Sequence, residues 1–188
     1  MQQRATPRAA TAAICLALIV LAGGCGGSGK GPTGGPSGPL LPSSATALPR
    51  MDPATFQALL TELHGKPVVV NIWASWCGPC RQEGPELAAV SKAHQGQVQF
   101  VGVDIEDQVG PARTFIEQYG WTYPSVFDST GAIRDSLGLI GQPDTLVFDA
   151  AGRRSFVSSG AITRQVLEAA ISKALQGGAS STTSPTGY

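Results

Sequence analysis

The chain has 188 residues, with 13 basic and 13 acidic side chains. This length accommodates one domain with a buried core plus terminal tails. A formal net charge of zero gives no electrostatic support to a nucleic-acid-binding role, so we expect no nucleic-acid partner. Many of the 24 glycines and 14 prolines lie in the first fifty residues, so the rest of the chain is more ordinary in composition.

Residues 1–24 have the pattern of an export signal. Arg4 and Arg8 precede an uninterrupted apolar run of 11 residues, 12–22. The run is shorter than the roughly 20 residues that cross a bilayer, but it is typical of the apolar centre of a signal peptide. The small residues that end it resemble a bacterial lipobox, whose cysteine, here Cys25, is lipidated. We therefore expect an exported lipoprotein anchored to the outer face of the cytoplasmic membrane. The alternative is ordinary cleavage that leaves a free thiol.

We assign residues 25–48 to the lipid anchor and a flexible linker. Of the 19 residues from 26 to 44, 15 are Gly, Pro or Ser, and such a composition cannot bury enough apolar surface to fold. A flexible chain of that length reaches about 25 Å on average. The linker is either a tether that lets the domain reach partners on the same membrane or a spacer of no tuned length.

The first folded elements are a helix and a strand. Asp52 can cap a helix that begins at Pro53, and Gly65 ends it. The helix carries one apolar face, formed by Phe56, Leu59, Leu60 and Leu63. The β-branched run Val68–Trp73 then predicts a buried strand.

A pair of cysteines follows that strand at the start of the next helix, in the sequence Cys77-Gly78-Pro79-Cys80. A helix N-terminus presents free N–H groups and a partial positive charge, which favour the thiolate of Cys77. Cys80 lies one turn further on and is expected to be shielded, as a resolving thiol. The order strand, Cys-x-x-Cys, helix predicts a dithiol that closes to a Cys77–Cys80 disulfide and reopens, with no other cofactor.

Three other uses of this pair are disfavoured by neighbouring residues. A structural zinc site needs four ligands, but no cysteine follows Cys80, and His64 and His94 lie at separate helix ends. Covalent haem attachment needs His directly after the second cysteine, where this chain has Arg81. A peroxidase of the peroxiredoxin type would resemble Thr three residues before a lone cysteine, where this chain has Ala74. We therefore expect no metal site.

At these residues a family resemblance is visible. Residues 71–80 resemble the active-site signature of thioredoxin-like proteins. Residues 81–85, with Glu83 three positions after the second cysteine, are similar to the membrane-anchored TlpA/ResA/CcmG branch of the redoxin (AhpC/TSA-like) superfamily. The resemblance implies an α/β thioredoxin fold: a central mixed sheet flanked by helices, with an extra N-terminal helix and a central βα-type insert. We place this domain at residues 49–176 and a disordered tail at 177–188.

The remaining elements are expected in the following order. They are a strand (98–103), an acidic loop (104–107), a helix (111–119), the insert (119–128), a short helix (132–137), a strand (145–149), an edge strand (155–158) and a last helix (163–175). We expect the carboxylates of the acidic loop to be solvated, because no ligand spacing supports a metal there.

The resemblance also implies roles for residues near the dithiol. In the thioredoxin fold a cis-proline begins the strand beside the dithiol, and Pro143 matches that place; the alternative is a trans proline. The backbone of Gln142 would then offer a strand edge to a partner. The family more often has Thr where this chain has Asp144, so substrate preference would differ.

Further implied roles concern proton transfer and partner contact. Thioredoxin has a buried Asp where this chain has Asn71, which carries no exchangeable carboxyl proton. In similar proteins the glutamate that matches Glu83 moves the proton of the second cysteine, and burial would raise its pKa. The alternative is an acid favoured only by the helix dipole. Trp76 is expected to be exposed for partner contact, and Trp73 to lie in the core.

Taken together, the resemblance implies a monomeric thiol–disulfide oxidoreductase outside the cytoplasmic membrane. Its expected partners are a membrane thiol donor of electrons and the oxidised thiols of envelope proteins, including apocytochrome c. One alternative is a DsbE-like thiol oxidase in the folding of secreted proteins. The other is a lipoprotein that binds a partner or haem without turnover.

Overall fold

The computed structural model describes residues 38–179. The predicted signal peptide, Cys25, the linker up to residue 37 and the tail from residue 180 lie outside the described residues. In chain order the elements are α1 (Pro53–Glu62), β1 (Val68–Trp73), α2 (Gly78–Ala93), β2 (Gln99–Ile105), α3 (Val109–Tyr119), β3 (Ser125–Asp128), α4 (Ala132–Ser136), β4 (Asp144–Phe148), β5 (Arg154–Ser159) and α5 (Arg164–Ala179). Within this range no helix is both long enough and apolar enough to cross a bilayer.

The strands form one mixed sheet in the order β3-β2-β1-β4-β5. β1 pairs in parallel with β2, and β2 with β3, because each connection crosses over through a helix. β4 runs antiparallel to β1, and a short turn then returns the chain as the antiparallel edge strand β5. The mixed sheet of the thioredoxin fold, which the resemblance implied, is therefore confirmed.

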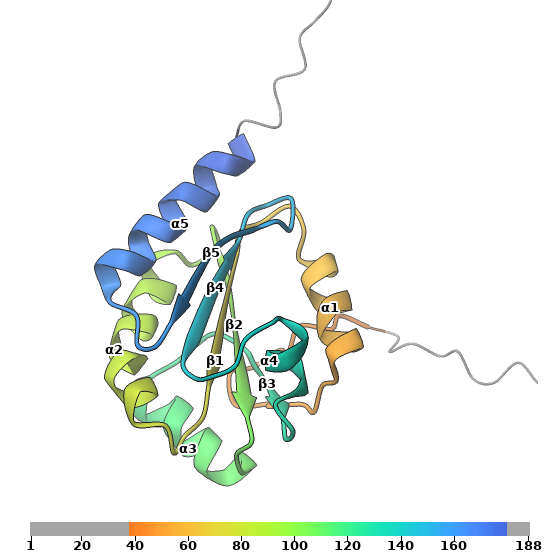
Figure 1. Ribbon diagram of the computed structural model, residues 1–188, viewed down its shortest axis with the longest axis vertical. Helices are drawn as coiled ribbons and strands as arrows, with labels where there is room; N and C mark the ends of the chain where they lie inside the picture. The colour runs from red at the N-terminus through yellow and green to blue at the C-terminus, as the bar shows by residue number, and fades with distance from the viewer. Residues whose placement is uncertain (1–37, 180–188) are drawn as a thin grey trace, which may run out of the picture. The chain divides into compact units, whose positions relative to one another are not determined.

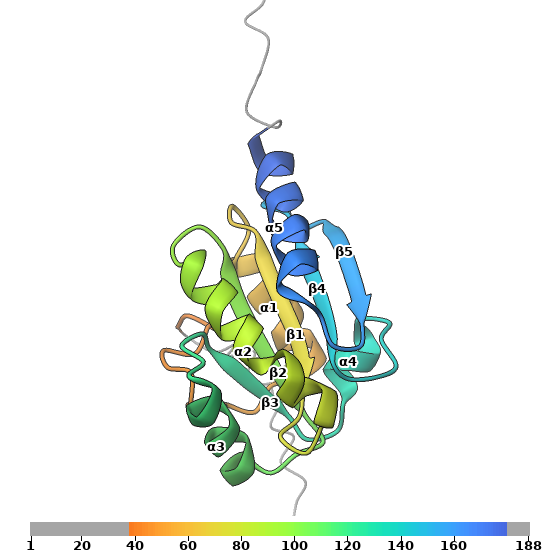
Figure 2. The same ribbon diagram turned by 90° about the vertical axis from the view of Figure 1, so that its left-hand side faces the viewer.

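Helices cover the sheet on both faces (Figures 1 and 2). α2, α3 and α5 pack on one face, and α1 and α4 on the other. All six residues of β1 are buried; Val69 and Trp73 belong to the core beneath α2, α3 and α5, whereas Val70 and Ile72 face α1 and α4. Burial on both faces explains why this strand is a nearly continuous apolar run.

The extra N-terminal helix and the central insert are both present. Asp52 caps α1 by accepting a hydrogen bond from the backbone N–H of Thr55 at 2.8 Å. In the insert, β3 extends the sheet beside β2, and the buried carboxylate of Asp128 accepts the N–H of Ile133 at 2.7 Å, which fixes α4 to the end of β3.

Several predicted boundaries were wrong. β2 continues to Ile105, two residues beyond the expected end, and α5 continues to Ala179, so residues 177–179 of the expected tail are helical. The folded domain also begins before residue 49. Leu48 is buried in the core on the α2 side of the sheet, and Leu40 and Leu41 pack against the core on the α1 side. These three leucines were assigned to the flexible linker because the segment around them is rich in Gly, Pro and Ser.

Candidate active site

The disulfide lies where β1 turns into α2. Cys77 is the N-cap residue of α2, and its Sγ accepts a hydrogen bond from the backbone N–H of Cys80 at 3.2 Å. Cys77 and Cys80 are joined by a disulfide, with their Cα atoms 5.3 Å apart. Cys77 is 4% exposed and Cys80 is fully buried. The sulfur of Cys77 is therefore the group that receives the free N–H groups and partial charge of the helix N-terminus.

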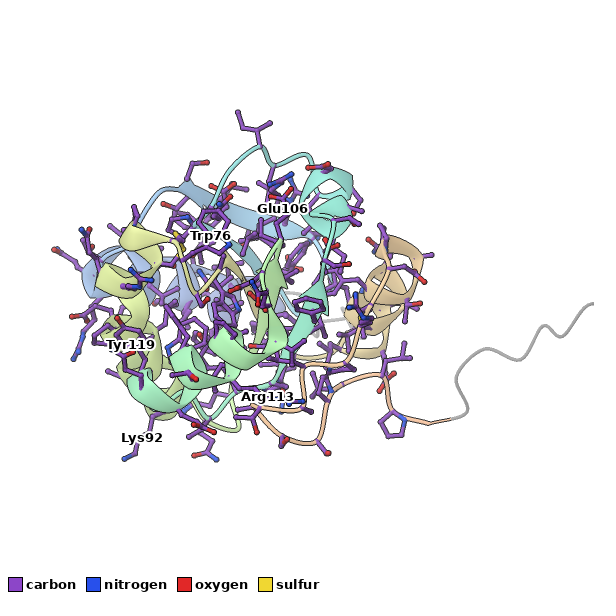
Figure 3. All side chains as sticks on the ribbon, turned by 90° about the horizontal axis from the view of Figure 1, so that it is seen from below. Trp76, Lys92, Glu106, Arg113 and Tyr119 are labelled. Carbon is purple, nitrogen blue, oxygen red and sulfur yellow. A yellow bond between two sulfur atoms is a disulfide. The ribbon has the colours of Figure 1, made fainter. Side chains whose placement is uncertain are left out.

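Two backbone segments hold the loop between β1 and α2. Trp76, which is 51% exposed, donates from its indole Nε1 to the carbonyl of Glu106 at 3.1 Å; Figure 3 shows these two residues near one another at the disulfide end of the molecule. Asp107 accepts hydrogen bonds from both the N–H and the hydroxyl of Ser75. Arg81 donates from α2 to the carbonyl of Ser75 at 2.7 Å, which places a cation beside the loop.

The expectation of a solvated acidic loop at 104–107 was therefore wrong for two of its acids. Asp104 belongs to β2 and is fully buried, and Asp107 is partly buried against Ser75. The error arose because β2 is longer than its apolar run, so that its polar end lies inside the sheet.

Glu83 is buried on the inner side of α2, one turn after Cys80. Its side chain is 1% exposed. Oε1 accepts a hydrogen bond from Asn71 Nδ2 at 2.8 Å, and Oε2 accepts the backbone N–H of Ile162 at 2.9 Å. Desolvation raises the pKa of Glu83 to about 7, with a small contribution from the charge of Asp144, while the two hydrogen bonds oppose the shift. Because positions three apart share a helix face, this carboxyl lies on the same side of α2 as Cys80.

Asn71 connects Glu83 to β4, the strand that directly follows Pro143. Its Nδ2 also lies 3.3 Å from the hydroxyl of Thr145, the residue that it pairs with across β1 and β4. The Gln142–Pro143 peptide bond is cis, in the conformation that the resemblance implied. Pro143 is buried and Gln142 is half-buried.

Sequence reasoning missed Thr145 and Ile162. Thr145 lies two residues after Pro143, but only the pairing of β1 with β4 brings it to Asn71. Ile162 contributes a backbone N–H, which no side-chain pattern could have indicated.

A groove adjoins the segments that hold this carboxyl. The groove has a volume of about 530 Å³ and runs between α2 and the start of α5. Glu83 and Ile162 lie at its base, and an ion pair between Glu86 and Arg164, 2.7 Å long, lies at its rim.

Aromatic side chains form the floor of the site. The buried ring of Trp73 stacks on Phe115 with centroids 4.7 Å apart, and Trp121 meets Trp73 edge-on at 5.0 Å. Trp121 also donates from Nε1 to the carbonyl of Gly84 in α2 at 2.9 Å. Trp73 is therefore a core residue, as expected, and the cluster keeps water from this side of the dithiol.

The described residues contain no group of three or more His, Cys, Asp or Glu side chains arranged to hold a metal ion. The candidate site is thus built from a disulfide, a carboxyl group and backbone donors. Such a set can transfer electron pairs between sulfur atoms and move protons to and from them.

Comparisons with known proteins agree with this chemistry. Residues 46–154 match the family model described as the AhpC/TSA family. The chain is 33% identical over 132 residues to HelX, a thiol:disulfide interchange protein of Rhodobacter capsulatus, covering 68% of this chain and 73% of HelX. It is 29% identical over 107 residues to the thiol-disulfide oxidoreductase ResA of Geobacillus thermodenitrificans, covering 56% of this chain. The match spans only 62% of the length of that relative.

A solved structure is similar as well. It is that of a secreted Mycobacterium tuberculosis disulfide oxidoreductase homologous to Escherichia coli DsbE, with a TM-score of 0.56 and 27% identity. The similarity covers 60% of this chain and 85% of that one.

The raised pKa of Glu83 predicts a pH dependence of stability. Below pH 4.5 the carboxyl is protonated in both the folded and the unfolded chain; between pH 4.5 and 7 the unfolded chain loses the proton and the folded chain keeps it. The free energy of unfolding should therefore fall over this interval, by up to about 3 kcal/mol from this group. Glu83→Gln should lack this contribution, as measured by urea unfolding of the oxidised protein at several pH values.

Glu86→Gln is the matched control, because Glu86 lies one turn further along α2 with a partly exposed side chain. It should keep the wild-type pH slope. A difference between wild type and Glu83→Gln that stays constant from pH 4.5 to 7.5 would contradict the assignment.

Proposed function

We propose that this chain, which belongs to the AhpC/TSA family, is a thiol–disulfide oxidoreductase that exchanges disulfides with other proteins. The observation that carries the proposal is the Cys77–Cys80 disulfide at the N-terminus of α2, with the buried carboxyl of Glu83 one turn behind it. The names of HelX and ResA, which describe interchange and oxidoreduction, support the same activity.

The exchange proceeds in two displacements. In the reduced protein, the thiolate of Cys77 attacks one sulfur of a partner disulfide, forming a mixed disulfide and releasing the other partner sulfur as a thiolate. Cys80 then loses its proton and attacks Cys77 Sγ, which closes the Cys77–Cys80 disulfide and releases the second partner thiolate. Two electrons pass from this protein to the partner. The reverse sequence oxidises a partner dithiol.

Glu83 is the proposed acid–base group for Cys80. A carboxyl with a pKa of about 7 is divided between its two protonation states near neutral pH, which suits both removal and return of a proton. The hydrogen bonds from Asn71 and Ile162 fix its orientation without supplying a positive charge that would hold it ionised. We propose that Asn71 acts as the positioning partner of this carboxyl.

The partner is proposed to dock between Trp76 and the cis-proline turn. Trp76 is half exposed beside the disulfide and supplies an apolar contact surface. The backbone of Gln142, directly before the cis bond, offers an extended edge to a partner chain. Gly78 and Pro79, which lie between the two cysteines, are both exposed.

We further propose that the protein acts outside the cytoplasmic membrane, anchored through lipidated Cys25, and that it reduces disulfides of envelope proteins such as apocytochrome c. The electrons would come from a membrane thiol donor. The second candidate is a DsbE-like thiol oxidase in the folding of secreted proteins, in keeping with the similarity to a secreted disulfide oxidoreductase homologous to DsbE, whose name fixes no direction of exchange.

Substitution of each cysteine in turn distinguishes the roles of the two thiols. Cys80→Ser should accumulate a mixed disulfide with partner proteins through Cys77, because the resolving thiol is missing. Non-reducing electrophoresis and mass spectrometry of envelope proteins would detect and identify the trapped partners. The matched control is Cys77→Ser, which should trap none; equal trapping by both variants would refute the assigned order of attack.

Exchange kinetics test the role of Glu83. Glu83→Gln should slow closure of the Cys77–Cys80 disulfide by on the order of a hundredfold at pH 7, the usual contribution of a general base. It should also remove an inflection near pH 7 from the rate profile measured by stopped-flow fluorescence. Glu86→Gln should retain the wild-type profile. A Glu83→Gln profile identical to wild type would exclude this carboxyl from the mechanism.

The midpoint potential decides the direction of exchange. A reducing protein should titrate near about −270 mV, whereas an oxidising one should titrate near about −200 mV or above. Equilibration of the Cys77–Cys80 pair with glutathione buffers, followed by alkylation of free thiols, measures this value. A midpoint in the upper range would replace the reducing role with the oxidising one.

A further inference from the structure

A second buried acid lies beneath the loop that carries Cys77, and the mechanism above does not use it. Asp104 lies in β2, in register with Trp73 of β1 and Phe127 of β3. Its side chain is fully buried, and neither carboxyl oxygen has a hydrogen-bond donor within the described part of the chain. A buried ionised carboxylate without donors or a cation is strongly destabilising. Asp104 is therefore expected to be neutral in the folded protein.

The neighbouring acid is in the opposite situation. Asp107, just beyond the end of β2, accepts hydrogen bonds from the backbone N–H of Ser75, the hydroxyl of Ser75 at 3.0 Å and the backbone N–H of Gln108 at 2.7 Å. Three donors stabilise the ionised form of a carboxyl group. Asp107 therefore already has donors of its own, which Asp104 lacks.

A single proton allows a hydrogen bond between the two carboxyl groups. Two ionised carboxylates are both acceptors and make no hydrogen bond, but a protonated Asp104 can donate to Asp107. Burial raises the pKa of Asp104 to about 9, and the charge of Asp107 together with this hydrogen bond adds to the shift.

We propose that Asp104 and Asp107 share one proton and act as a positioning pair that holds Ser75, and through it the segment that carries Trp76 and Cys77. The pair forms a chain of contacts from the buried end of β2 to the loop. The hydroxyl of Asp104 holds the carboxylate of Asp107, which holds both donors of Ser75. Any consequence for disulfide exchange rests on the proposed function, whereas the shared proton itself does not.

Other charged groups near the pair have partners of their own. On the same loop, the carboxylate of Glu106 is directed to Arg134 of α4, 3.2 Å away. From α2, Arg81 donates to the carbonyl of Ser75 rather than to either acid. The carboxyl groups that face inward from α2 and β3 also have hydrogen-bond donors of their own. Glu83 accepts from Asn71 and Ile162, and Asp128 accepts from Thr130 and Ile133.

The first experiment observes the proton directly. The full chain is oxidised, so that no thiol titrates, and its Asp side chains are labelled with ¹³C at the carboxyl carbon. We expect one carboxyl to titrate near pH 9, and the backbone amide signal of Ser75 to shift with the same midpoint. Asp104→Asn should abolish both transitions, because its amide donates to Asp107 at every pH. Titration of all Asp carboxyls below pH 6 would overturn the proposal.

A matched charge control is Glu117→Gln, on the exposed side of α3. It removes one negative charge from the surface of α3 without changing either acid of the pair. It should leave the transition near pH 9 in place. Loss of the transition in this variant would show that it reports surface charge, which would also overturn the proposal.

The second experiment tests whether the pair positions Cys77. In the reduced protein at pH 7, Asp104→Leu should lower the rate of Cys77 alkylation by iodoacetamide by roughly tenfold, because the loop loses its support. Asp104→Asn should stay within about twofold of wild type, since the donor is retained. Equal rates in all three proteins, or equal losses in both variants, would refute positioning.

The titration and alkylation experiments test the positioning pair separately from the proposed function. If Asp104→Leu does not fold, the Ser75 amide signal still decides, because it must follow the carboxyl titration in wild type and lose this transition in Asp104→Asn; a Ser75 signal that does not follow the titration in wild type would refute positioning. A protein that shows both results but exchanges no disulfide with any partner would refute the proposed function and leave the positioning pair in place.

Discussion

The hydrogen bond from the Cys80 backbone N–H to Cys77 Sγ is the contact around which the site is organised. It makes a sulfur atom the N-cap of α2, in the place where serine or aspartate usually supplies an oxygen. The cap is possible because β1 is buried on both faces and cannot shift, so the chain leaves the sheet after Trp73 at a fixed position. Four residues then suffice to bring Cys77 to the helix N-terminus.

Glu83 and Asp104 are buried on the same side of the sheet, and they differ in the number of hydrogen-bond donors that each carboxyl group receives. Glu83 and Asp104 are almost equally inaccessible to solvent. Glu83 receives two hydrogen bonds, which offset part of its desolvation and leave its pKa at about 7. For Asp104 the desolvation is opposed by no donor and is reinforced by the charge of Asp107, so its pKa rises to about 9. The first acid is thus suited to exchange a proton near neutrality and the second to retain one.

The site is built from residues of several elements, which come together on the α2 side of the sheet. α2 provides Cys80 and Glu83, β1 provides Asn71, β4 provides Thr145, and the turn just before β4 provides the cis-proline. The segment before α5 contributes the N–H of Ile162, and the loop after β2 contributes Asp107. Because each of these groups touches another, a change in the packing of α5 or of the acidic loop would alter the chemistry at the disulfide without touching a cysteine.

The sequence by itself determined the parts that depend on neighbouring residues. Asp52 and Pro53 predicted the start of α1, the β-branched run predicted β1 at its observed bounds, and the spacing of Cys77 and Cys80 predicted their disulfide. The family resemblance added the cis conformation of Pro143 and a raised pKa for Glu83.

Only the tertiary structure decided how the acids are used. The donors to Glu83 lie 12 and 79 residues away along the chain, and Asp107 reaches Ser75 across 32 residues. The segment 104–107 contains three acids and was therefore predicted to be exposed to solvent, because a sequence pattern gives the type of each side chain but not what packs around it. Desolvation and hydrogen-bond donors are set by which strands pair and which helices cover them, so the protonation of a buried carboxyl is a property of the folded chain.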